Sequence, residues 1–151
     1  MFEIGTWKGG SSTYFIAHAL KKNRKGTLYT IEADRELFSH AERLYQTRLK
    51  SLKPYVRFHL GKSDEIYPGI LESLTNVDML FLDGAEDAEQ TLEEFHMFLP
   101  KLTIGSVVAC HDWKIHKMAK LRPFLEGDKQ WKCIALITDS PTGFSAWEKI
   151  A

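Results

Sequence analysis

Strand-like and helix-like segments alternate along most of the chain, beginning at the first residue. Apolar or β-branched runs predict strands at residues 1–4, 27–31, 55–60, 77–82 and 106–110. Segments with apolar side chains at helical spacing predict helices at residues 11–22, 34–52, 63–74, 88–99 and 115–125. This alternation favours a parallel sheet covered by helices on both faces, whose ligands bind at the carboxyl ends of the strands.

The C-terminal part of the chain departs from this alternation. Residues 132–138 and 143–150 are strand-like, and the turn-rich residues 139–142 join them without a helix. This pattern predicts an antiparallel hairpin. We therefore predict an α/β fold with a doubly wound, mostly parallel, seven-stranded sheet that ends in this hairpin.

Length and charge narrow the classes of function. At 151 residues and 44% hydrophobic content, the chain suits a single domain spanning residues 1–151. Twenty basic side chains balance twenty acidic ones, so the charge pattern does not support a nucleic-acid partner. No charged segment leads into an apolar run near Met1, no apolar run reaches about 18 residues, and two cysteines do not suggest a disulfide framework, so we expect a cytoplasmic protein without a membrane partner.

A glycine-rich loop follows the first predicted strand. Its sequence, Gly-Thr-Trp-Lys-Gly-Gly-Ser-Ser from Gly5, offers glycines for a tight turn and for close approach of the backbone to a ligand. Ser11 and Ser12 are placed to cap the next helix, whose N-terminus favours an anionic group such as a carboxylate. The spacing differs from the glycine patterns of dinucleotide enzymes and nucleoside triphosphatases, which weakens both phosphate-binding interpretations.

A carboxylate stands at the end of the second predicted strand. Glu32 follows the glycines by about twenty residues, where it can accept hydrogen bonds from both ribose hydroxyls of an adenosine ligand. The loop and this acid together are more specific than either alone.

Three motifs carry a family resemblance: Glu-Ile-Gly-Thr-x-x-Gly-Gly-Ser from Glu3, Thr-Ile-Glu-Ala-Asp around Glu32, and Asp-Met-Leu-Phe-Leu-Asp-Gly ending at Gly84. With them, nearly the whole chain resembles the class I S-adenosylmethionine-dependent methyltransferases, particularly the small catechol-type O-methyltransferases. The resemblance implies a Rossmann-like fold, S-adenosylmethionine as cofactor and a small molecule as methyl acceptor.

The same resemblance implies where the cofactor binds. The loop from Gly5 to Trp7 would wrap the methionine part, and Ser11 would meet its carboxylate. Glu32 would hold the ribose, and residues 61–63 would border the adenine. The full predicted set of cofactor-binding residues is Glu3, Gly5, Thr6, Trp7, Gly9, Ser11, Glu32, Ala33, Lys62, Ser63 and Asp83.

Polar side chains end the fourth and fifth predicted strands. Asp83 follows one strand, and His111 and Asp112 follow the other. Because neighbouring parallel strands end at the same edge of a sheet, we expect the three to meet beside the cofactor and to form the catalytic centre. Methyl transfer from a sulfonium needs alignment of the acceptor and removal of its proton, which such groups can provide.

Three interpretations of this cluster stay open. In metal-dependent relatives, the equivalent positions hold Mg²⁺ or Ca²⁺, so Asp83, His111 and Asp112 are candidate ligands of a divalent metal. Imidazole suits Zn, Mn or Fe better than Mg²⁺, which leaves the metal open. Alternatively, His111 is a general base oriented by Asp112, or the residues are a structural polar pair.

Other positions depart from the family pattern. Catechol-type enzymes place a catalytic lysine, and another related group a histidine, at the position of Glu86. Asp87 is expected to serve the start of a helix. Cys110 is expected to be a buried small hydrophobe, and Trp113 and Trp147 belong to the core or line an acceptor pocket.

The first predicted strand begins almost at Met1, whereas relatives carry helices ahead of it. Either a partner or a second subunit, as in a homodimer, completes the pocket, or the chain is a shortened version of a longer one. The leading hypothesis is methyl transfer to a hydroxyl of a small molecule such as a sugar, phenol or natural product. The alternatives are an inactive cofactor-binding module that acts through a protein partner and, more weakly, an NAD-dependent oxidoreductase.

Overall fold

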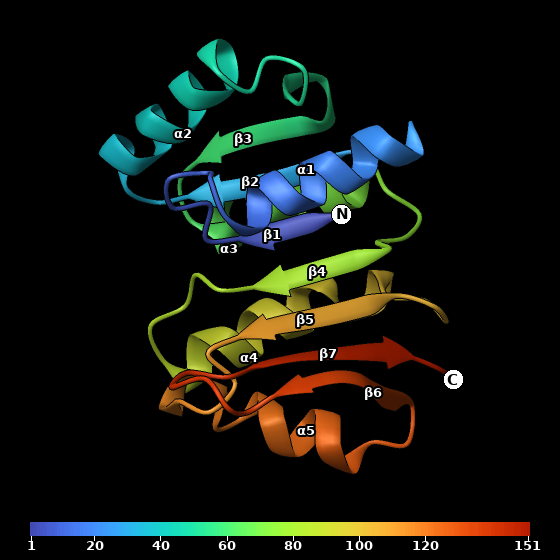
Figure 1. The fold of residues 1–151 in the computed structure, drawn as a ribbon. Coiled ribbons are helices and arrows are strands. Elements are labelled where there is room, and N and C mark those ends of the chain that lie inside the picture. The colour runs from blue at the N-terminus through green and yellow to red at the C-terminus, as the bar shows by residue number, and fades with distance from the viewer. The chain divides into compact units, whose positions relative to one another are not determined.

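The computed structural model describes all 151 residues and contains seven strands and five α-helices (Figure 1). The chain divides into two compact units, residues 1–66 and 67–151. No helix is long and apolar enough to cross a membrane.

The first unit contains three parallel strands. They are β1 (Phe2–Ile4), β2 (Leu28–Glu32) and β3 (Val56–Leu60), with β2 between the other two. Phe2 pairs with Tyr29, and Leu28 pairs with Val56. Helices α1 (Ser12–Asn23) and α2 (Arg35–Thr47) connect the strands, and α3 (Ser63–Glu72) begins in this unit. These elements confirm the predicted βαβαβ order.

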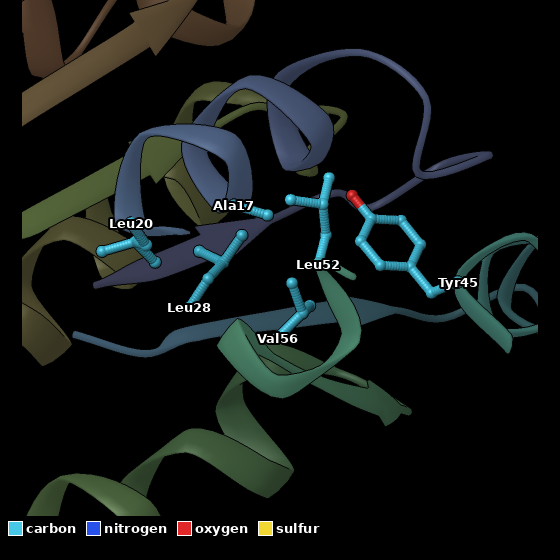
Figure 2. Close-up of a cluster of buried hydrophobic side chains, with 6 residues drawn as sticks. All are labelled: Ala17, Leu20, Leu28, Tyr45, Leu52 and Val56. Atoms are coloured by element: carbon cyan, nitrogen blue, oxygen red, sulfur yellow. The ribbon is translucent and has the colours of Figure 1, made fainter. Parts of the chain in front are cut away.

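One hydrophobic cluster holds the first unit together (Figure 2). Its side chains come from both connecting helices, from β2 and β3 and from the turn before β3; they are Ala17, Leu20, Leu28, Tyr45, Leu52 and Val56. All are at most 5% exposed. Burial of these side chains packs α1 and α2 against β2 and β3.

The predicted second helix is too long at its C-terminus. We predicted a helix to residue 52, but α2 ends at Thr47. The Leu44 carbonyl accepts bonds from the amides of both Arg48 and Leu49, which closes the last turn. The apolar spacing continues beyond this point because Leu52 enters the core from a turn, and Pro54 lies in a short 3₁₀ segment at Lys53–Tyr55.

The second unit contains parallel and antiparallel strands. β4 (Met79–Leu82) pairs in parallel with β5 (Val107–His111), so that Leu82 lies opposite Cys110. β7 (Phe144–Lys149) pairs antiparallel with both β5 and β6 (Trp131–Ile137), which confirms the C-terminal hairpin.

The connections in the second unit are α4 (Ala88–Phe98), after β4, and a broken helical segment after β5. We predicted one helix over residues 115–125. The structure has a 3₁₀ turn at His116–Met118 and a separate helix, α5 (Leu121–Gly127). Pro123 therefore lies in the first turn of a helix, where its missing N–H costs little.

Candidate functional site

The loop after β1 is attached to the end of β2. The amides of Gly5 and Thr6 both donate to the Ile31 carbonyl, at 3.1 and 3.0 Å, and the Gly9 amide donates to the Thr6 carbonyl at 3.0 Å. Gly5, Trp7 and Gly9 have positive φ angles of 97°, 49° and 71°. The loop therefore forms the tight turn that the glycines predicted.

Gly9 lies close against α2. A Cβ atom built on Gly9 would lie 3.0 Å from the Cβ of Ala41 and 3.4 Å from the ring of Tyr45. Gly10 has no neighbour within 4 Å of such an atom. Gly9 is thus required by packing as well as by its φ angle, whereas Gly10 is required by neither.

Glu32 stands at the end of β2 and holds two backbone segments. One carboxylate oxygen accepts from the Trp7 amide at 2.7 Å, and the other accepts from the Asp34 amide at 2.9 Å. Each carboxylate oxygen has further lone pairs, and the residue is half-buried. The carboxylate is therefore fixed in direction and can still accept hydrogen bonds from a ligand.

Glu3 lies beneath the loop, in a buried polar network. Its carboxylate accepts from the hydroxyls of Thr13 at 2.7 Å and Thr30 at 2.6 Å, and the hydroxyls of Thr30 and Thr6 contact each other. The residue is 0% exposed. These contacts tie β1, β2 and α1 together and give Glu3 a supporting position under the loop, and its contact with the cofactor stays a prediction.

The remaining predicted cofactor residues of the first unit differ in exposure. Trp7, Ser11, Ala33 and Lys62 are exposed, whereas Ser63 is buried at the start of α3. The expected capping role of Ser11 is not observed: Ser11 occupies the N-cap position of α1, but its side chain makes no capping hydrogen bond. Its hydroxyl makes no hydrogen bond to a helix amide and is available for another partner.

Asp83, His111 and Asp112, predicted to meet at strand ends, do lie together in the second unit. The Nδ1 atom of His111 is 3.1 Å from Oδ1 of Asp83 and 2.9 Å from Oδ1 of Asp112. One potential ligand atom from each residue lies within 4.8 Å of the others. Asp112 has a φ angle of 59°, so its side chain is held in the cluster by an unusual backbone conformation.

Lys117 is a fourth member of this cluster, and the sequence analysis missed it. Its ammonium group is 2.7 Å from Oδ2 of Asp112, 3.4 Å from Oδ1 of Asp83 and 3.3 Å from the Asp83 carbonyl. Its side chain is only 8% exposed. Three lysines recur at intervals of three, Lys114, Lys117 and Lys120, and nothing in the sequence distinguishes the buried one.

The surroundings move the pKa values of the two carboxyl groups apart. Burial raises the pKa of Asp83, although the charges of His111 and Lys117 act in the opposite direction. Burial also acts to raise the pKa of Asp112, but the hydrogen bond and charge of Lys117, together with His111, outweigh it and lower that pKa. Asp112 is therefore the charged partner of Lys117, and Asp83 is the weaker acid.

The other residues considered in the sequence analysis cap a helix, lie in the core or are exposed. Asp87 caps α4 by accepting from the amides of Glu89 and Gln90, both at 2.9 Å, as expected. Cys110 is buried, and burial raises its pKa to about 12, which agrees with a small core residue. Trp113 and Trp147 pack against each other and are 3% and 7% exposed, so they belong to the core. Glu86 is exposed.

Comparison with known proteins gives a family match for most of the chain and a fold match for nearly all of it. A family model described as a methyltransferase domain matches residues 2–113. The O-methyltransferase TomG from Streptomyces achromogenes, involved in tomaymycin synthesis and solved in complex with SAM, is 24% identical, with a TM-score of 0.77; the match covers 99% of this chain and 72% of that one.

Two further solved structures share the fold. The O-methyltransferase from Bacillus cereus in complex with SAH is 21% identical, has a TM-score of 0.75 and matches over 98% of this chain and 73% of that one. An rRNA methylase from Streptococcus thermophilus is 14% identical, has a TM-score of 0.68 and matches over 99% and 86%. These similarities confirm the Rossmann-like fold class. No curated protein matches the chain.

Proposed function

Because the chain belongs to the methyltransferase-domain family, we propose that it transfers a methyl group from S-adenosylmethionine to a hydroxyl oxygen of a small molecule. The observation that carries the cofactor assignment is Glu32, whose carboxylate is fixed by the Trp7 and Asp34 amides and keeps lone pairs for ribose hydroxyls. TomG and the Bacillus cereus enzyme, solved with SAM and SAH respectively, are O-methyltransferases and support the same donor and reaction.

We assign the cofactor to the first unit. The loop from Gly5 to Gly9 holds the methionine part, and the Ser11 hydroxyl, which caps no helix amide, binds its carboxylate. Glu32 binds the ribose, and Ala33, Lys62 and Ser63 border the adenosine. Glu3 supports the loop from below through its threonine partners.

We assign removal of the acceptor proton to His111. Two carboxylates lie within 3.1 Å of its Nδ1 atom and favour the proton on that nitrogen, so Nε2 carries the lone pair. Nε2 takes the hydroxyl proton as the oxygen attacks the methyl carbon. The new C–O bond forms, the C–S bond breaks and its electrons remain on sulfur, which turns the sulfonium into the thioether S-adenosylhomocysteine.

The balanced charge of the chain favours a small acceptor over RNA, although the fold also occurs in an rRNA methylase. A panel of phenols, sugars and a structured RNA, assayed with radiolabelled S-adenosylmethionine, tests this choice. Methyl incorporation into RNA alone would contradict it.

Isothermal titration with S-adenosylhomocysteine tests the cofactor assignment. We expect Glu32→Ala to weaken binding by at least about tenfold, because a charged acceptor of two hydrogen bonds is lost. Glu32→Gln keeps the size of the side chain and one of the two acceptor oxygens, so we expect it to lose less affinity than Glu32→Ala. Glu36, an exposed glutamate in the first turn of α2, provides the matched control. Equal affinities for Glu32→Ala and Glu36→Ala would reject the site.

A turnover assay tests the role of His111 as the general base. We expect His111→Gln to lower kcat by about 10²-fold or more with little change in S-adenosylhomocysteine affinity, because a general base contributes about this much. A variant that binds the cofactor normally and turns over at the normal rate would exclude His111 from this role.

A further inference from the structure

The cluster of Asp83, His111 and Asp112 already contains a cation, which is the ammonium group of Lys117. Three donor groups, from Asp83, His111 and Asp112, lie close enough together to suggest a divalent metal site. However, the Lys117 ammonium is 2.7 Å from Asp112 and 3.4 Å from Asp83, at the same carboxylates that a metal would need. The donor set as folded does not fit a divalent ion, because such an ion would have to displace an ammonium group from both.

All three protons of this ammonium group have oxygen acceptors. They are Oδ2 of Asp112, Oδ1 of Asp83 and the Asp83 carbonyl, at 2.7 to 3.4 Å. A lysine is rarely buried without partners, and one that is 8% exposed has already lost most of its hydration. If Lys117 left the cluster, its ammonium group would lose all three of these oxygen acceptors.

Repulsion also acts against a metal here. A divalent ion between the two carboxylates would lie a few ångströms from the ammonium charge, in a partly buried setting where charges interact more strongly than in water. The two remaining lysines of the segment do not balance the cluster in the same way. Lys114 donates to the carbonyls of Thr138 and Ser140, and Lys120 pairs with Glu89.

We propose that Lys117 takes the place of the divalent cation of metal-dependent relatives, so that this protein performs methyl transfer without a bound metal. The proposal rests on the proposed function for its catalytic meaning. Lys117 is a positioning residue: its single positive charge offsets part of the negative charge of Asp83 and Asp112 and holds both carboxylates beside Nδ1 of His111. The proton of the acceptor then passes to His111 rather than being lost from a metal-bound hydroxyl.

Electron paramagnetic resonance of Mn²⁺ tests the proposal without any acceptor. We expect no saturable Mn²⁺ binding to the wild-type protein at millimolar concentration. Lys117→Met removes the charge and keeps most of the side-chain volume, and we expect it to bind Mn²⁺ saturably, at least about tenfold more tightly than the limit set by the wild type. Adding Asp112→Asn to this variant removes a ligand and should abolish the gain. Lys120→Met, which changes an exposed lysine on the same segment, should leave Mn²⁺ binding as in the wild type.

Two further measurements separate this proposal from the proposed function. Circular dichroism and S-adenosylhomocysteine titration report whether Lys117→Met folds and binds cofactor. Lys117→Arg keeps a cation and should continue to exclude Mn²⁺, which a purely structural role would not predict. Tight Mn²⁺ binding to the wild type that Asp83→Asn removes would overturn the proposal, even if S-adenosylhomocysteine binds as expected.

Discussion

At the residue scale, the absence of a side chain at Gly9 lets the loop after β1 pack closely against α2. At Gly9, a φ angle of 71° coincides with a space that a methyl group would enter only by approaching the Ala41 Cβ to 3.0 Å. Ala41 is itself fully buried on α2, so the helix cannot give way cheaply. The loop and the helix are therefore coupled at this residue.

We expect Gly9→Ala to lower the free energy of unfolding by about 1 to 3 kcal/mol, because the left-handed backbone conformation and the close contact both oppose a side chain. Urea denaturation measures the change. Gly10→Ala is the matched control, since its added Cβ meets nothing within 4 Å and its φ angle is not positive. If the two variants had the same stability, the contact with α2 would carry no energy.

Part of the candidate site could be predicted from the types of its residues and their places in the sequence. The glycines and Glu32 stand in a pattern with a physical reason, and Asp83, His111 and Asp112 follow directly from where strands end. Lys117 was not predictable in this way. Its inward direction depends on the 3₁₀ turn at His116–Met118, which breaks the helical spacing that its neighbours suggest.

At the scale of elements, the N-cap residues of the helices differ in whether their side chains accept hydrogen bonds from helix amides. Asp34 and Asp87 each accept two amide hydrogen bonds at the starts of α2 and α4. Ser11 occupies the same position on α1 and accepts none. The difference separates caps that stabilise a helix from a hydroxyl that is available to a ligand.

We expect Asp87→Ala to cost about 1 kcal/mol of stability, the usual value of a lost N-cap, with S-adenosylhomocysteine affinity unchanged. Ser11→Ala should do the reverse and weaken cofactor binding while leaving the urea midpoint within error. Calorimetric titration and urea denaturation of the same two preparations measure both effects. A Ser11→Ala variant as unstable as Asp87→Ala would mean that Ser11 acts as a cap in solution.

Element boundaries were less predictable than element order. The apolar spacing of residues 34–52 suggests one helix, yet α2 ends at Thr47 because Leu52 reaches the core from a turn. Periodicity reports which side chains are buried and does not report the backbone that delivers them. For this reason the seven strands were predicted in order, while the helix predicted over residues 34–52 is too long and the one predicted over residues 115–125 is broken in two.

At the scale of the whole molecule, the fold says less about the methyl acceptor than the residues of the site do. The same fold, over nearly the full chain, occurs in an O-methyltransferase of tomaymycin synthesis and in an rRNA methylase. The acceptor is therefore not encoded in the strand order, because one fold hosts different chemistries. The single-domain organisation and a homodimer remain predictions from the sequence.

The stability of the molecule should also depend on pH through one histidine of β3. Burial lowers the pKa of His59 below the ordinary value of 6.5, so the unfolded chain takes up its proton first as the pH falls. The contribution of His59 is fully present above about pH 6.5 and is lost as the pH falls towards the folded pKa.

We therefore expect the urea midpoint of the wild type to fall between pH 7.5 and pH 5.5 by more than that of His59→Gln, which has no proton to gain. His18→Gln, an exposed histidine on α1, is the control and should follow the wild type. Other titrating groups are common to all three proteins and cancel in the comparison. A wild type and a His59→Gln variant that lose stability in parallel over this range would show that His59 is solvated equally in the folded and unfolded states.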